Sequence, residues 1–449
     1  MDFEKAGWFD RYLEFRSDLP LPRSLPTSGV QLFDKSGFHN EQDQATYAFL
    51  QPTGLLYGFP INSPLPDLEY PHKQYLNDAG LVSLIWLDSL MACLVADREY
   101  LLSGVHDEAD HFTHAVRALT YYFVNQEEQS TDGLLGAVSR AKAFVERLPI
   151  GHNRPQHRDL ERALARRIRS GGDILHVPQY AYNGFLFLDL YYCMAWQRAM
   201  VLDPAKRHVH MTELKSERER VRETLLLLLI AAAHASGGVG EIEQRVFDRF
   251  LASAGLDKAR NAALRQTMTT GLALEDVTIP ETPWLVRRHL LDITLMLILA
   301  DRQYDEPEQQ LAEKLVQRLG LWDEELEQSH AALDSFLIVN ENTLHFLKSR
   351  TQVHILAERL GNRAQNVLRK NLDRIVNEIR ETKELYDLLL KSRSQALTAE
   401  EKKKVRLQLY DILKTVPTLA IFAMPGGSVI LPILIRLLPF NLLPTSFED

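Results

Sequence analysis

Apolar side chains follow helical spacing along most of the chain after residue 80. They recur at intervals of three and four residues over Leu81, Leu84, Ile85, Leu87 and Leu90 to Val95. This spacing is typical of an α-helix that buries one broad face, and alternation of the kind that favours β-strands is sparse. The chain is therefore predicted to be all-α and multi-helical, with further helices over residues 107–124, 133–148, 159–169 and 184–200.

The first 80 residues have a different pattern, in which proline and glycine interrupt the apolar positions. Leu19-Pro20-Leu21-Pro22 and Asn62-Ser63-Pro64-Leu65-Pro66 are dense examples, and such sequences favour turns over long helices. We therefore expect an irregular segment that wraps the helical body. Together with the patterns below, the expected segments are residues 1–80, 81–210, 211–330, 331–415 and 416–449.

Two stretches in the middle of the chain share one plan. Residues 225–243 and residues 290–308 each contain an apolar helix, a turn, and an acidic start to the next helix. Residues 94–100 also resemble residues 299–304. An internally repeated helix-turn-helix unit is therefore predicted.

The sequence becomes strongly charged between Thr343 and Lys414. Its apolar residues still follow helical spacing, which predicts a long amphipathic helix or a helical hairpin. Thr398-Ala-Glu-Glu401 has the form of a capping box, so a new helix is expected to begin there. That helix carries toward the C-terminus the basic residues Lys402, Lys403, Lys404 and Arg406.

The last segment, residues 416–449, contains an uncharged run from Val416 to Ile435. A helix of about 20 residues spans roughly 30 Å, enough to cross a bilayer. The centre of the run cannot form a regular helix, because it is interrupted by Pro425, Gly426, Gly427 and Pro432. Two short helical pieces are predicted, with a break near residues 425–427. The run either contacts lipid as a kinked or re-entrant segment or packs as a buried pair of helices on the soluble body.

Composition and charge change this picture little. The 449 residues include 60 acidic and 51 basic side chains, a formal charge of -9 that is spread along the chain, so no basic footprint for nucleic acid stands out. The N-terminus lacks the basic start and apolar stretch of a secretory signal. Cys93 and Cys193 lie in apolar surroundings, where buried free thiols are expected. The main body is therefore expected to be cytosolic, with no nucleic-acid partner.

The sequence shows no motif of catalysis. Its Gly-Gly pairs lack the continuation of a phosphate-binding loop, and there is no Gly-x-Ser-x-Gly elbow, so the chain is expected not to be an enzyme. Residues 106–114, His-Asp-Glu-Ala-Asp-His-Phe-Thr-His, could hold a metal, but the preferred interpretation is a capped polar helix. A solvated helix face rather than an anion site is predicted for Arg162, Arg166, Arg167 and Arg169.

The first repeated stretch carries Gly237, Val239 and Glu243 after its apolar helix. This arrangement resembles the helical tellurite-resistance TerB family, in which an apolar helix runs into Ala-Asp-Gly, then Val, then an acidic residue. Ser236 stands where that family has the aspartate. The second stretch keeps the acidic pair but has Arg302 in place of the glycine.

The TerB resemblance implies a site for a divalent cation, because in some such proteins the acidic pair is associated with one. The candidate ligands are Asp301, Asp305 and Glu308, and hard cations favour clustered oxygen ligands. The alternative is that these carboxylates cap and charge the start of a helix. A divalent cation is the only cofactor that the sequence suggests. An equimolar cation in the purified protein that is lost in Asp301→Ala would identify the site.

The tail has a distinctive order of proline and aromatic residues: Pro417, Phe422, Pro425, the Leu-Pro pairs that end at Pro432 and Pro439, and the closing Leu443-Pro444-Thr445-Ser446-Phe447. That order resembles the membrane segment of LETM proteins, which are mitochondrial inner-membrane proteins tied to cation and proton exchange and to ribosome contact. The family continues into a large helical domain associated with ribosome binding, whereas this sequence closes at Asp449. Ribosome binding and exchange are therefore not expected.

The combination of TerB-like helices with a LETM-like tail is similar to bacterial proteins described as LETM-related and biofilm-associated. We expect a non-enzymatic, membrane-associated helical scaffold or stress-linked accessory protein. Its cytoplasmic helices would bind a protein partner, and its tail would contact membrane lipid at the inner membrane, beside the basic flank of residues 402–406. The alternative function is divalent-cation binding or cation homeostasis.

Overall fold

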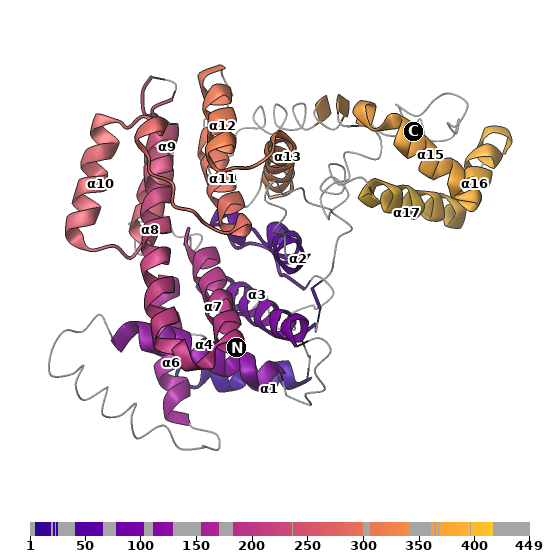
Figure 1. The fold of residues 1–449 in the computed structure, drawn as a ribbon. Helices are drawn as coiled ribbons and strands as arrows, with labels where there is room; N and C mark the ends of the chain where they lie inside the picture. The colour runs from indigo at the N-terminus through magenta and orange to yellow at the C-terminus, as the bar shows by residue number, and fades with distance from the viewer. Residues whose placement is uncertain are drawn as a thin grey trace. The chain divides into compact units, whose positions relative to one another are not determined.

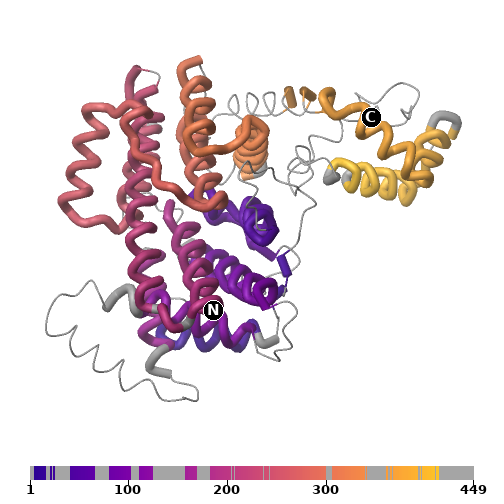
Figure 2. Tube along the Cα trace, in the orientation of Figure 1, coloured from indigo at the N-terminus to yellow at the C-terminus, as the bar shows by residue number. Residues whose placement is uncertain are grey.

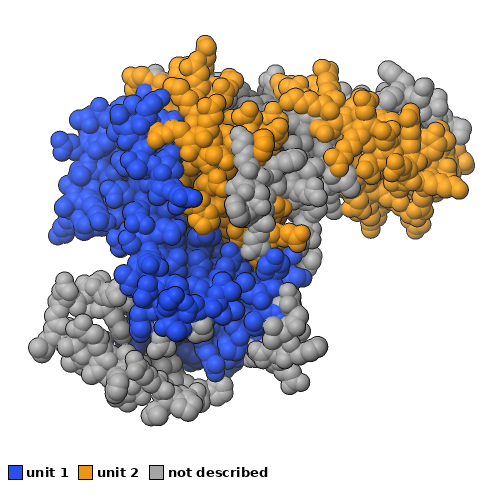
Figure 3. Space-filling view, viewed as in Figure 1, with its two compact units in different colours: residues 1–25, 53–234, 243–281 blue, residues 26–52, 235–242, 282–449 orange. Residues whose placement is uncertain are grey.

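The computed structural model is all-α over the residues that it describes (Figure 1). These are residues 5–18, 21–22, 24–25, 41–65, 78–102, 111–128, 154–169, 183–235, 237–299, 306–340, 361–362, 365–366, 368–395 and 397–415. The predicted fold class is confirmed, since helices account for the regular structure of all of these stretches. The chain divides into two compact units, which are coloured separately in Figure 3.

Unit 1 comprises residues 1–25, 53–234 and 243–281. Its longer helices are α1 (Trp8–Asp18), α3 (Asp78–Leu101), α4 (His111–Glu128), α6 (Arg154–Arg169), α7 (Leu186–Leu202), α8 (Arg207–Ala233), α9 (Glu241–Ser253) and α10 (Lys258–Thr270). Short 3-10 helices lie at η2 (Leu55–Tyr57), η4 (Pro204–Lys206) and η5 (Leu274–Asp276).

Helices α3 and α7 form the centre of unit 1. Helix α3 packs against α4, α6 and α7, and α7 also packs against α8. Every side chain of α7 from Leu186 to Met194 is buried, because a helix that is apolar on nearly all sides must be enclosed by other helices. The one polar atom of the Trp86 ring, Nε1, donates a hydrogen bond to the carbonyl oxygen of Leu186 at 3.0 Å.

One helix among the described residues is long and apolar enough to cross a membrane. It is Gly80–Leu101 within α3, and 94% of its most apolar window is buried inside the fold. Length and composition are shared by core helices and membrane spans. Here neighbouring helices already cover the apolar face that begins at Leu81.

Unit 2 comprises residues 26–52, 235–242 and 282–449. Its helices are α2 (Glu41–Leu50), η1 (Gln51–Thr53), α11 (Trp284–Ile298), α12 (Glu306–Arg318), α13 (Asp323–Val339), α15 (Leu372–Glu381), α16 (Lys383–Ser394) and α17 (Ala399–Thr415). Helix α11 packs against α2, α12 and α13, while α15, α16 and α17 pack against one another.

The predicted duplication of a helix-turn-helix unit is confirmed by the helix boundaries. In the first copy α8 ends at Ala233, α9 begins at Glu241 and α10 begins at Lys258. In the second copy the corresponding boundaries are Ile298, Glu306 and Asp323. Each lies the same number of residues further along the chain than its counterpart in the first copy. Two stretches of sequence with little identity therefore form the same succession of helices.

An arginine at the same position of each copy binds the C-terminal end of the second helix in that copy. Nη1 of Arg222 in α8 donates to the carbonyl oxygen of Ala254 at 3.1 Å, and Nη1 of Arg287 in α11 donates to that of Leu319 at 3.0 Å. Each carbonyl belongs to the residue directly after the second helix of its copy, in the region where backbone acceptors have no partner within the helix. The glycines that follow, Gly255 and Gly320, have φ angles of 67° and 63°, which favour glycine in both copies.

The expectation of an irregular N-terminal segment is wrong for two stretches, α1 and α2. Both stretches are free of proline and glycine, so nothing in them prevents helix formation. Their aromatic residues, such as Phe9 and Tyr47, are buried, and this packing stabilises short helices that would be marginal alone. Two expected segment borders, at residues 210 and 330, fall within the continuous helices α8 and α13.

Candidate functional site

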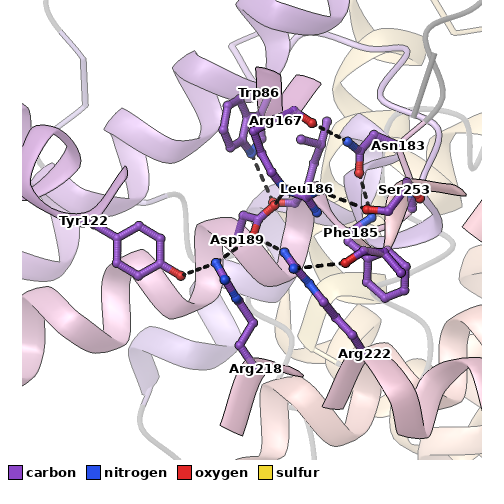
Figure 4. A network of polar contacts seen from close by, with 12 residues as sticks. Trp86, Tyr122, Arg167, Asn183, Phe185, Leu186, Asp189, Arg218, Arg222 and Ser253 are labelled. Atoms are coloured by element: carbon purple, nitrogen blue, oxygen red, sulfur yellow. Dashed lines mark hydrogen bonds and ion pairs between the residues drawn. The ribbon is translucent and has the colours of Figure 1, made fainter. Parts of the chain in front are cut away.

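A buried ionic network lies at the centre of unit 1 (Figure 4). Asp189 of α7 is fully buried and is surrounded by Arg167 of α6 and by Arg218 and Arg222 of α8. Arg167 donates through Nε to Oδ2 of the aspartate, and Arg222 donates through Nη2 to Oδ1. Nη1 of Arg218 lies 3.3 Å from Oδ1. The network therefore places three cations around one carboxylate.

Backbone carbonyl groups complete this network. Nη1 of Arg167 donates to the carbonyl oxygen of Ser253 at 3.0 Å, and Arg222 donates to the next carbonyl, that of Ala254. Both carbonyls lie at the C-terminal end of α9, where the helix dipole attracts positive charge. The network thus ties α6, α7 and α8 to the end of α9.

The pKa shifts agree with a fully ionised network. Burial alone raises the pKa of Asp189, but the three arginines outweigh burial and hold this pKa below its ordinary value. Burial, together with Arg167 and Arg218, lowers the pKa of Arg222 to about 9, so this side chain is protonated at neutral pH. Burial also raises the pKa of Tyr122 to about 12, which keeps its hydroxyl neutral beside Arg218.

The sequence interpretation of the basic cluster in α6 is wrong for one of its members. Arg162 and Arg166 are exposed, as a solvated face requires, whereas Arg167 turns toward Asp189. Helical spacing shows which residues share a face but not which neighbouring helix covers that face. The signal that could have revealed the network is Asp189 itself, because a carboxylate inside an apolar helix needs a cationic partner.

A second buried network joins α2, α11 and α13 in unit 2. Nη1 of the fully buried Arg288 lies 3.4 Å from Oε1 of Glu325, and its Nη2 donates to the Tyr47 hydroxyl at 3.2 Å. The Tyr47 hydroxyl in turn donates to Oδ2 of Asp292 at 2.8 Å, and Nε1 of Trp284 donates to Glu325 at 2.6 Å. Burial raises the pKa of Asp292 even though Arg288 opposes this shift.

Of the predicted cation ligands, Glu308 lies among the described residues, whereas Asp301 and Asp305 lie outside them. Glu308 is buried in the first turn of α12, and Glu243 is buried in the same position of α9. A buried acid at this position is therefore common to both copies, as expected where a carboxylate meets a helix N-terminus. Within the part of the chain that the structure describes, no group of three or more His, Cys, Asp or Glu is placed to hold a metal. The cation site stays a prediction.

Part of the histidine-rich string over residues 106–114 is also described. His111 begins α4, and its Nε2 lies 3.0 Å from Oε2 of Glu99 in α3. Residues 106–110 lie outside the described residues. The contact made by His111 fits the interpretation of this string as the polar start of a helix.

The last described residues, 368–395 and 397–415, form a three-helix group made of α15, α16 and α17 (Figure 2). Ion pairs join α16 to α17: Lys391 to Glu401, and Lys404 to Glu384. All three helices contribute to one apolar core, which includes Ile375, Ile379, Leu385, Leu389, Val405 and Leu409. The predicted amphipathic hairpin is thus a compact group of three helices over this stretch.

Helix α17 begins where the sequence predicts. The backbone nitrogen of Glu401 donates to Oγ1 of Thr398 at 3.2 Å, and the backbone nitrogen of Thr398 donates to Oε2 of Glu401 at 2.9 Å. This reciprocal pair is the predicted capping box. The helix then continues to Thr415, directly before the uncharged run of the tail.

The three-helix group differs in charge from the chain as a whole. Residues 368–415 contain twelve basic and eight acidic side chains, whereas the full chain has a net charge of -9. Helix α17 turns Val405, Leu409 and Ile412 into the apolar core. We call the opposite surface the outer face of α17; it exposes Lys403, Arg406 and Leu407.

A known protein family matches this same part of the chain. Residues 397–449 match the family described as LETM1-like, RBD. The match covers α17 and the tail, which make up about an eighth of the chain. It supports the interpretation of the chain as a LETM-related protein. No curated protein and no solved structure matches the chain.

The LETM1-like match confirms the resemblance that the proline and aromatic order of the tail indicates. It begins at Leu397, so the resemblance extends beyond the tail to α17 and its capping Thr398. The description assigns this part to the RBD of the family, whereas the sequence pattern indicates the membrane segment alone. The tail residues themselves lie outside the described residues, and their two helical pieces stay a prediction: Pro417, Phe422, Pro425, Gly426, Gly427, Pro432, Pro439, Pro444 and Phe447.

Proposed function

We propose that this chain is a LETM-related helical scaffold protein that associates with a membrane through residues 397–449. The observation that carries the proposal is the LETM1-like, RBD match over this region. The region joins α17, whose outer face is basic, to the uncharged run from Val416 to Ile435. Uncharged segments of this length bury their apolar side chains in lipid or protein, and a basic flank suits the cytoplasmic side of a membrane.

The helical body supports the scaffold role. The charges around Asp189 are paired within their own network, and Arg288 is paired with Glu325 within the second network. Each network therefore holds together the helices of its own unit. A body of this kind presents surfaces to a protein partner.

In its finer form the proposal is that the duplicated units are TerB-like and that the protein serves a stress- or biofilm-linked process at the bacterial inner membrane. Cation binding by Asp301, Asp305 and Glu308 is the alternative function.

Deletion of residues 416–449 is expected to move the protein from the membrane fraction to the soluble fraction of the cell. The apolar side chains of the tail would no longer be available for lipid, whereas the core residues that the structure describes all precede residue 416. Cell fractionation measures the release, and circular dichroism of the purified truncated protein is expected to retain a cooperative helical unfolding transition.

A shorter deletion of residues 441–449 is the matched control, because it keeps the whole uncharged run. This variant is expected to stay in the membrane fraction. A full-length protein that is soluble and monomeric, together with a long deletion that unfolds the body, would show that the tail is a core element and would contradict the proposal.

A further inference from the structure

The outer face of α17 combines two cations with an exposed apolar side chain. Leu407 is 55% exposed, and Lys403 and Arg406 have no ion pair among the described residues. The neighbouring Lys404, in contrast, is bound by Glu384 of α16. Helical spacing of three and four residues places Lys403, Arg406 and Leu407 on one face.

The orientation of this face is determined by the packing of α17. Val405 and Leu409 lie in the core of the three-helix group, so the helix cannot turn Leu407 inward without exposing them. Burying an apolar side chain of this size is worth roughly the same at either position. Leu407 therefore stays exposed and is available to an external apolar surface.

An anionic lipid surface fits these residues better than other partners. Its headgroups attract Lys403 and Arg406, and its interface accepts the apolar Leu407, as in amphipathic helices that lie on membranes. A nucleic acid would attract the cations but would leave Leu407 uncovered.

The place of α17 in the chain points to the same partner. Helix α17 ends at Thr415, and the uncharged run begins at the next residue. At a rise of ~1.5 Å per residue, Leu407 lies about 12 Å along the helix axis from that end. A tail that contacts lipid therefore keeps the outer face of α17 close to the headgroups.

We infer that the outer face of α17, formed by Lys403, Arg406 and Leu407, docks on anionic lipid headgroups and selects negatively charged membranes. This inference rests on the proposed function, since it names the lipid class that the membrane-associated region recognises. The uncharged run supplies apolar attachment, and the outer face supplies the preference for negative charge.

The experiment measures binding of the full-length protein to vesicles by flotation. Vesicles of phosphatidylcholine alone are compared with vesicles in which about a third of the lipid is phosphatidylglycerol. The double variant Lys403→Gln with Arg406→Gln is expected to bind the anionic vesicles about 30-fold more weakly than the wild type, given the usual contribution of each basic residue near such a surface. Its binding to neutral vesicles is expected to be unchanged.

A second double variant, Arg369→Gln with Arg380→Gln, is the matched control. Arg380 lies on α15 of the same group and Arg369 lies three residues before that helix, and both are exposed. The net charge therefore changes equally while the outer face of α17 stays intact. This control is expected to bind anionic vesicles within about threefold of the wild type. An equal loss in both double variants would show that only net charge matters and would overturn the inference.

The outcomes separate the inference from the proposed function. Equal binding of the wild type to neutral and anionic vesicles would overturn the inference and leave membrane association intact. Absence of binding to both kinds of vesicle would overturn both. Polyuridylate that binds the wild type more tightly than the vesicles do, with Lys403 and Arg406 required, would replace the lipid by a nucleic acid and overturn the inference.

Discussion

Replacing Asp189 with Asn lowers the free energy of unfolding by about 3 to 5 kcal/mol, the usual effect of breaking a buried ion pair. The substitution leaves Arg167, Arg218 and Arg222 around a neutral amide that is fully buried. The carbonyl and hydroxyl oxygens that these arginines contact carry partial charges, which offset less of the mutual repulsion than a carboxylate does. Urea denaturation at neutral pH, followed by circular dichroism, measures this loss.

The matched control for this prediction is Asp248→Asn. Asp248 pairs with Arg265 at 2.6 Å in the same unit, but this pair lies near the surface, with 57% of the Arg265 side chain and 33% of the Asp248 side chain exposed. Exposed pairs contribute about 0.5 kcal/mol, so the control is expected to stay close to the wild type. Equal stability of the Asp189 variant and the control would contradict the buried network.

The second large effect is expected for Glu325→Ala in unit 2. Glu325 accepts hydrogen bonds from the Trp284 ring and from the backbone nitrogen of Trp322, and it faces the buried Arg288. Its removal leaves a buried guanidinium and a buried indole nitrogen with fewer acceptors. It also removes the carboxylate that accepts from the backbone nitrogen of Trp322 at the start of α13. A loss of about 3 kcal/mol is expected from these terms.

Asp292→Asn in the same network is the control, because the effect of this substitution on stability is expected to depend on pH. Because burial raises the pKa of Asp292, the folded state binds the proton of this acid more tightly than the unfolded state. Its contribution to stability is therefore complete below the unfolded pKa of about 4 and falls as pH rises toward the folded pKa. Asparagine mimics the protonated acid.

The Asp292 variant is thus expected to be about as stable as the wild type near pH 4 and more stable than the wild type near pH 7. Glu325→Ala is expected to be less stable than the wild type at both pH values. Denaturation curves at the two pH values test both statements. A variant of Asp292 that loses stability relative to the wild type as pH rises would show that its charged form is the stabilising one.

The sequence predicted those features that depend on local pattern. Apolar periodicity identified α3 and α7, because both are enclosed on nearly all sides and their sequences show it directly. The capping box at Thr398 was identified because its two partners lie within one helical turn. The duplicated helix-turn-helix units followed from the order of apolar run, turn and acidic restart.

Features that depend on distant parts of the chain could not be predicted in this way. Arg167 and Asp189 belong to different helices, and no spacing rule links them. Likewise α1 and α2 look too short and too close to prolines to be stable, until their buried aromatic residues are seen in tertiary packing. The outer face of α17 also depends on knowing which side of that helix meets α15 and α16.

A single fluorescent label in the tail tests membrane attachment most directly. Cys93 and Cys193 are both buried as free thiols, and burial raises the pKa of each well above its ordinary value. A cysteine introduced as Leu434→Cys therefore reacts first with an environment-sensitive maleimide. Glu313→Cys, at an exposed position of α12, provides the labelled control.

On adding anionic vesicles, the label at residue 434 is expected to shift its emission to shorter wavelength and brighten, while the emission of the label at residue 313 stays unchanged. A label at residue 434 that is already shielded without vesicles and does not respond to them would contradict membrane attachment through the tail.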